Sequence, residues 1–158
     1  MVEAIRQGDI PGVQLRRRQA FTLPPEELWR WLVEPEKLTL WLAEEAEVEP
    51  GPEGSLTLSG TTPRVDPPAG PWRERGRTLD FAPPNLWVLA FERLDAGWTF
   101  TTRLTLRLNR TPGGAEIDVL QQGFQRLPLS VGLTIWESYR ARWRSTLAKL
   151  ADLAARVA

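Results

Sequence analysis

Few side chains in this sequence could carry out chemistry, because histidine and cysteine are both absent. Their absence removes the commonest ligands of zinc, iron and copper, and every Ser-His or Cys-His nucleophile. Any general acid or base would be a carboxylate, a tyrosine, an arginine or a lysine. Glu137 and Tyr139 are one candidate pair, but residues two apart on a helix point to different sides. We therefore predict no catalytic residue, no metal site and no cofactor.

Three glutamates, Glu45, Glu47 and Glu49, alternate with Ala46 and Val48. Acids so close together could suggest a metal site. A period of two is, however, typical of a half-buried strand with one face in water. We interpret the glutamates as that exposed face.

Arginines cluster at Arg16–Arg18 and again at Arg140, Arg142 and Arg144. The first cluster could suggest binding of phosphate or nucleic acid. However, 20 basic and 20 acidic residues give a formal net charge of zero, and a strand would divide three consecutive side chains between two faces. We expect both clusters to be solvated, the second on the wet side of a helix, and we predict no nucleic-acid partner.

The elements that must position these side chains begin with an extended segment over residues 12–21. Pro24–Glu27 is typical of a helix start, and Pro35 predicts that a second short helix begins after about Val33. Six strands are then predicted over residues 45–49, 55–60, 72–81, 86–93, 98–109 and 115–124, with a bulge at Gly76. The proline-rich segment 61–71 is predicted to be a surface loop.

From about Leu129 the apolar residues recur every three or four positions as far as Val157. This pattern predicts a long amphipathic helix over 129–157, and the whole chain, 1–158, is predicted to be one α+β domain. One helix cannot fill a strongly curved seven-stranded antiparallel sheet, so we expect a cavity between them. We predict that ten residues line it: Trp41, Leu58, Trp87, Leu89, Phe91, Leu104, Gln121, Trp136, Tyr139 and Trp143.

The tryptophans of the two short helices, and Gln121, need separate interpretation. Trp29 and Trp31 cannot share a helix face and are expected to pack in the core, one on the sheet and the other at the helix margin or at a contact surface. Trp41 is either a core residue or a wall of the cavity. Gln121, on the same strand face as apolar residues, must find partners in protein, water or ligand.

The segments TLPPEELWRWLVEPEKLTLWL, VEPGPEGSLTLSG, RGRTLDFAPPNLWVLAFER and TTRLTLRLNRTPGGAEIDVLQQGF, in this order, resemble the family homologous to the activator of the heat-shock protein 90 ATPase. This family belongs to the START-like, helix-grip superfamily, which also includes polyketide cyclases and a birch-pollen allergen. The resemblance implies one strand, two short helices, six strands and a long helix, with a pocket beneath that helix. It implies no single activity. Gln121 stands where relatives often carry another polar residue or histidine, and we expect a lone domain without the module through which the eukaryotic co-chaperone grips its chaperone.

Three functions follow as hypotheses. The first is a binding module for a hydrophobic small molecule, such as a lipid, an aromatic compound or a polyketide-like compound, with its polar end near Gln121. The second is a co-chaperone or stress-related protein that binds its partner through its surface, which an exposed apolar patch containing Trp29, Trp31 or Trp41 would favour. The third is a cyclase- or hydratase-type enzyme, which would need two ionisable side chains within hydrogen-bond reach inside the cavity.

The remaining expectations concern the setting of the protein. No signal-like segment or long apolar run is present, so we expect a cytoplasmic protein without membrane insertion, as a monomer or homodimer. Its 14 prolines and the arginine excess hint at a thermophilic source, although a GC-rich genome explains the arginines equally well.

Overall fold

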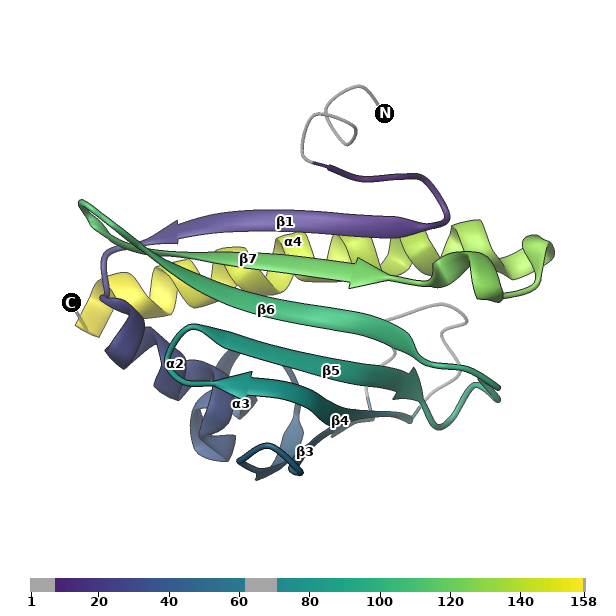
Figure 1. Ribbon diagram of the computed structural model, residues 1–158, viewed down its shortest axis with the longest axis horizontal. Helices are drawn as coiled ribbons and strands as arrows, with labels where there is room; N and C mark the ends of the chain where they lie inside the picture. The colour runs from purple at the N-terminus through teal and green to yellow at the C-terminus, as the bar shows by residue number, and fades with distance from the viewer. Residues whose placement is uncertain (1–7, 62–70, 158) are drawn as a thin grey trace.

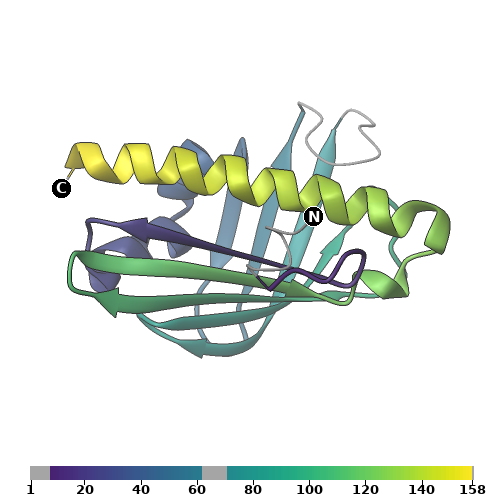
Figure 2. The same cartoon turned by 90° about the horizontal axis from the view of Figure 1, so that it is seen from above.

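The computed structural model describes residues 8–61 and 71–157 and contains one antiparallel sheet with a long helix across one face (Figures 1 and 2). The chain runs through β1 (Gln14–Phe21), α2 (Pro25–Val33), α3 (Pro35–Trp41), β2 (Glu45–Glu49), β3 (Ser55–Gly60), β4 (Trp72–Ala82), β5 (Leu86–Arg93), β6 (Thr102–Thr111), β7 (Gly114–Gln122), a 3-10 turn (Phe124–Arg126) and α4 (Leu129–Val157). The predicted α+β class and order of elements are confirmed. The predicted loop over 61–71 falls almost entirely outside the described residues.

The seven strands lie in the order β1-β7-β6-β5-β4-β3-β2. Consecutive strands from β2 to β7 pair as neighbours. β1 pairs with β7 and is one edge of the sheet, and β2 is the other edge. Figure 2 shows α4 lying along β1 and β7 while β3 and β4 cross in another direction, so the sheet twists strongly around the helix. The short helices α2 and α3 lie beside the C-terminal half of α4 (Figure 1). The core is therefore enclosed by the sheet, α4 and the helix pair. No helix among the described residues is long and apolar enough to cross a membrane.

The two short helices bury all three of their tryptophans. Trp29 stacks on Phe81 with ring centroids 5.5 Å apart and also contacts Trp87. Trp31 lies at the helix margin, where the Lys37 ammonium sits 4.6 Å from its ring centroid. Both are core residues, as predicted. Because no tryptophan of this segment is exposed, the patch expected of a co-chaperone is not formed by these residues.

The predicted bulge at Gly76 is wrong. Gly76 pairs regularly with its neighbours on β3 and β5, and the irregularity lies between Thr78 and Asp80. An extra residue, Leu79, reverses the alternation there, so that Asp80 stays in water and Phe81 turns toward the tryptophans of the core. Gly76 has a different role, since an added Cβ would lie 3.0 Å from Leu89 Cδ2.

The strand predicted over residues 98–109 also starts too early. β6 begins at Thr102 instead of residue 98, because its pairing with β5 ends at the Phe91–Thr102 pair and β5 itself ends at Arg93. Trp98 and Phe100 then stack on one another, with centroids 5.3 Å apart, outside the strand. On β2, by contrast, the three glutamates are exposed as predicted, and the described residues contain no acidic, histidine or cysteine group that could hold a metal ion.

The N-terminal arginine cluster is only partly solvated, which corrects the prediction. Arg18 is exposed, but strand alternation directs Arg17 to the inner face, where it is buried and both Asp9 carboxylate oxygens accept from it at 3.1 Å. Arg140 on α4 donates to the same carboxylate at 2.8 Å. Burial lowers the pKa of Arg17, and Asp9 opposes that shift. The cluster ties the start of the chain and β1 to α4.

Candidate functional site

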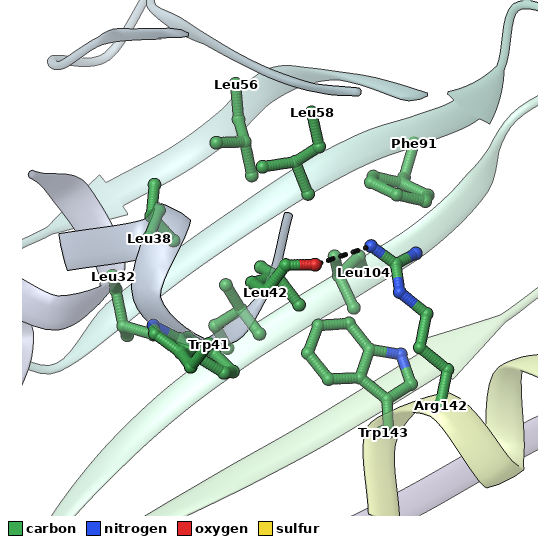
Figure 3. Close-up of a pocket in the computed structure, with 11 residues that line it drawn as sticks. Leu32, Leu38, Trp41, Leu42, Leu56, Leu58, Phe91, Leu104, Arg142 and Trp143 are labelled. Carbon is green, nitrogen blue, oxygen red and sulfur yellow. Dashed lines mark hydrogen bonds between the residues drawn. The ribbon is translucent and has the colours of Figure 1, made fainter. Parts of the chain in front are cut away.

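An enclosed cavity lies between α4, the inner face of the sheet and the two short helices (Figure 3). Its volume is about 10 Å³, which is room for about one water molecule. The wall is apolar except for one charged side chain: it consists of Leu32, Leu38, Trp41, Leu42, Leu56, Leu58, Phe91, Leu104, Leu106, Arg142 and Trp143. The interior is thus packed around a small space with a single cation at its edge.

Half of the ten predicted residues meet at this wall, namely Trp41, Leu58, Phe91, Leu104 and Trp143. The other five, Trp87, Leu89, Gln121, Trp136 and Tyr139, are buried but lie outside it. Gln121 is satisfied by protein: it donates to Thr102 Oγ1 at 3.1 Å and accepts from Trp143 Nε1 at 3.0 Å. The amide therefore fixes the orientation of a cavity-wall tryptophan and is not itself the polar end of the cavity.

The polar group at the cavity is Arg142, which the sequence placed wrongly on the wet side of the helix. Its side chain is only 3% exposed. The twisted sheet and the helix pair cover a broad arc of α4, so Arg142 is buried along with its neighbour Trp143. Its Nη1 donates to both oxygens of Glu74, at 2.6 and 2.5 Å, and its Nη2 lies 3.4 Å from the Leu42 carbonyl oxygen (Figure 3).

Glu74 is a functional candidate that the sequence reasoning missed. It lies on β4, fully buried, and accepts a 2.5 Å hydrogen bond from the Tyr139 hydroxyl. The sequence contains a sign of this position. Every second residue of the strand points inward, and these residues are Trp72, Glu74, Gly76 and Thr78. An acid at an inward position between a tryptophan and a glycine must be paired with a cation or hydrogen-bonded when buried.

Burial, followed by the nearby charge of Glu74, raises the pKa of Tyr139 well above its usual value of 10. The phenol is therefore protonated at neutral pH and acts as a donor, not as a base. Its ring packs among Phe91, Trp98 and Phe124, with centroids 5.8 to 6.3 Å away. Tyr139, Glu74 and Arg142 thus form one hydrogen-bonded unit in which a single positive charge is matched by a single negative charge.

Two buried donors in this part of the molecule have no hydrogen-bond partner within residues 8–61 and 71–157, namely Arg142 Nε and Trp98 Nε1. A buried donor left unpaired costs about 1 to 3 kcal/mol. Arg142 is the one of the two that lines the cavity. The arrangement leaves an unused N–H on the only charged residue of the wall.

Trp41 forms a partition between the cavity and the exterior. Its indole Nε1 donates to the Trp31 carbonyl oxygen at 3.0 Å. The same residue lines the internal cavity and a surface groove of about 380 Å³, whose other lining residues include Glu44, Ser145 and Lys149. Trp41 is therefore the residue that the two linings share.

Comparison with known proteins gives the same architecture. The sequence matches the family described as Activator of Hsp90 ATPase homolog 1-like protein over residues 22–155. A crystal structure of a Rhodobacter sphaeroides protein is 24% identical, covers 94% of this chain and 97% of its own, and has a TM-score of 0.73. A Chromobacterium violaceum protein is 22% identical, with coverages of 90% and 97% and a TM-score of 0.69. The solution structure of an AHSA1-like protein from Aeromonas hydrophila is 12% identical, with coverages of 92% and 95% and a TM-score of 0.67. The search of curated proteins finds no match.

Proposed function

We propose that this chain, which belongs to the Activator of Hsp90 ATPase homolog 1-like family, binds a small hydrophobic molecule between α4 and the sheet. The observation that carries the proposal is the enclosed apolar cavity with one buried cation in its wall. Sites for small molecules in proteins are mostly apolar, with a few placed polar groups. The START-like fold of the family is consistent with such a binding module.

A cavity of about 10 Å³ holds no ligand larger than water, so binding requires side chains to move. We propose that the ligand enters from the groove between α3 and α4 by displacing the Trp41 indole. One hydrogen bond, to the Trp31 carbonyl oxygen, holds that indole in place. Serine, lysine and glutamate side chains at the groove would contact the ligand first, and the apolar wall would receive its body.

The proposal is tested by titrating the purified protein with naphthalene, indole and decanoic acid while the indole N–H signals are followed by NMR. We expect saturable shifts at Trp41 and Trp143, which line the cavity, and none at Trp136, which is bonded to the Gln14 carbonyl oxygen beyond it. Leu58→Phe fills the space and should abolish the shifts. Leu108→Phe is the matched control, because Leu108 is equally buried in the sheet but lies outside the wall. Shifts that persist in Leu58→Phe would contradict the site.

A second candidate function is catalysis of the cyclase or hydratase type. One observation favours it, since Glu74 lies within hydrogen-bond reach of both Tyr139 and Arg142 inside the core. Both partners already satisfy the carboxylate, however, and the phenol is held protonated. A test is the exchange of the α-hydrogens of acetophenone for deuterium in D₂O, which a buried carboxylate base would accelerate and which Glu74→Gln should then abolish. Exchange at the uncatalysed rate in the native protein would remove this candidate.

The co-chaperone alternative stays a prediction. Trp29, Trp31 and Trp41 are all buried, so a chaperone interface would have to use other residues. A pull-down with purified heat-shock protein 90 tests it directly, and recovery of none of that chaperone would count against it.

A further inference from the structure

Arg142 has one donor, Nε, with no partner among the residues that the structure describes. Glu74 engages Nη1, and the contact from Nη2 to the Leu42 carbonyl oxygen is long, at 3.4 Å. Nε is buried and has no partner among the described residues. Figure 3 shows the guanidinium lying between Leu42, Leu104 and Phe91, with the Leu42 carbonyl oxygen as the one hydrogen-bond acceptor that is drawn for it. A buried guanidinium with an unused N–H can hydrogen-bond one further acceptor.

The charge of the cluster limits what that acceptor can be. Glu74 is fully buried and both its oxygens contact Arg142, so the cation is already matched by an anion at close range. A ligand carboxylate would add a second negative charge beside Glu74 in an apolar cavity, with no second cation in the wall to match it. A neutral oxygen would satisfy the spare N–H without that repulsion.

We propose, building on the proposed function, that the ligand carries a neutral carbonyl oxygen on an apolar body and that this oxygen accepts a hydrogen bond from Arg142. Glu74 and Tyr139 are positioning residues. The carboxylate orients the guanidinium through Nη1, and the phenol orients the carboxylate through its 2.5 Å hydrogen bond. The apolar body lies against the leucines and Trp143 of the wall.

Three probes of similar shape test the chemistry: acetophenone, α-methylstyrene and benzoate. Acetophenone and α-methylstyrene differ in C=O against C=CH₂, and benzoate carries the negative charge. We expect acetophenone to bind about tenfold or more tighter than α-methylstyrene, because hydrogen bonds to charged groups are the stronger class. Benzoate should bind more weakly than acetophenone. In the native protein, acetophenone should move the Arg142 Nε–H signal further downfield than α-methylstyrene does, because only the carbonyl oxygen accepts that proton, a difference that a purely structural role would not produce.

Arg142→Lys removes the Nε–H and keeps a positive charge for Glu74. In this variant the preference for acetophenone over α-methylstyrene should fall, because the ammonium is held by Glu74 and no donor remains at the Nε position, and the affinity for α-methylstyrene should be close to that of the native protein. Arg140→Lys is the matched control, since Arg140 lies on the same helix and pairs with Asp9, away from the cavity. If Arg142→Lys does not fold, the Nε–H signal of the native protein still decides the matter.

The possible failures are distinguishable. Equal affinity of the native protein for acetophenone and α-methylstyrene, or tighter binding of benzoate, would overturn the inference while the proposed binding function stood. If neither acetophenone nor α-methylstyrene binds at all, the proposed function fails and the inference fails with it.

Discussion

Two arginine–carboxylate clusters hold α4 against the rest of the molecule, and they differ in how completely they are satisfied. Asp9 accepts from Arg17, from Arg140 Nε at 2.8 Å and from the Arg16 backbone N–H at 2.7 Å. Its arginines lie near the edge of the sheet, and the Arg140 side chain is 22% exposed. Glu74 and Arg142 are shielded from water, with side chains 0% and 3% exposed.

This difference separates a structural cluster from a candidate binding one. At Asp9 the four hydrogen bonds match what one carboxylate can accept, and one of the two arginines, Arg140, is partly exposed to water. At Glu74 the carboxylate is satisfied by a guanidinium and a phenol, but the guanidinium, which lines a cavity, keeps a donor with no partner within residues 8–61 and 71–157. Removing a charge should therefore do more damage at the second cluster than at the first.

The largest expected effect is that of Glu74→Gln, which leaves Arg142 as a buried and uncompensated charge. Breaking a buried pair in this way costs about 3 to 5 kcal/mol. Asp9→Asn also removes the anion beside the buried Arg17, but Arg17 keeps its 2.6 Å hydrogen bond to the Arg16 carbonyl oxygen and water can reach Arg140, so the loss should be smaller, about 2 kcal/mol. Urea denaturation of both variants measures the free energies of unfolding. The double variant Glu74→Gln with Arg142→Met should recover part of the loss, and equal losses at Asp9 and Glu74 would erase the distinction between the clusters.

Next in size is Tyr139→Phe, which removes the hydrogen bond from the phenol to a charged, buried acceptor, at a cost of about 2 to 3 kcal/mol near neutral pH. The cost should depend on pH. The pKa of Tyr139 is higher in the folded state than in the unfolded state, so its stabilisation is complete below about pH 10 and is lost as pH rises toward the folded-state value. The stability difference between native protein and Tyr139→Phe should therefore narrow above pH 10. A difference that stays constant from pH 8 to 11 would show that the phenol is not in this environment.

A smaller loss is expected from Gln121→Met, which leaves the Trp143 indole N–H buried without its acceptor at a cost of about 1 to 2 kcal/mol. Because the amide orients Trp143 and does not line the cavity, the preference for acetophenone over α-methylstyrene should persist. Thermal unfolding and the same NMR titration check the two statements separately. Loss of the preference in this variant would return Gln121 to the role that the sequence suggested for it.

The architecture could be predicted well from the sequence, because the spacing of apolar residues and the positions of the prolines largely determine it. Pro35 separates α2 from α3, and the change to a helical period locates the start of α4 at Leu129. The site was harder to predict, because the width of the buried arc on α4 depends on how far the sheet and helix pair wrap around it. That width depends on the tertiary structure, and it decides whether Arg142 is exposed to solvent or buried. The inward position of Glu74 could be predicted from strand alternation alone, whereas its hydrogen bond with Tyr139, 65 residues away, could not.

The smallest effect should come from Arg75, the neighbour of Glu74 on β4. Strand alternation directs it to the outer face, where it pairs with Glu92 at 3.2 Å and is 55% exposed. Exposed pairs of this kind contribute about 0 to 1 kcal/mol, so Arg75→Thr should change the free energy of unfolding by less than about 0.5 kcal/mol. Any change should fall further in 1 M NaCl, because salt screens exposed charges. The loss in Glu74→Gln, by contrast, should be nearly independent of salt. A salt-sensitive effect at Arg75 and a salt-independent effect at Glu74, the residue before it, would show that burial, rather than position along the chain, gives the Glu74–Arg142 pair its effect.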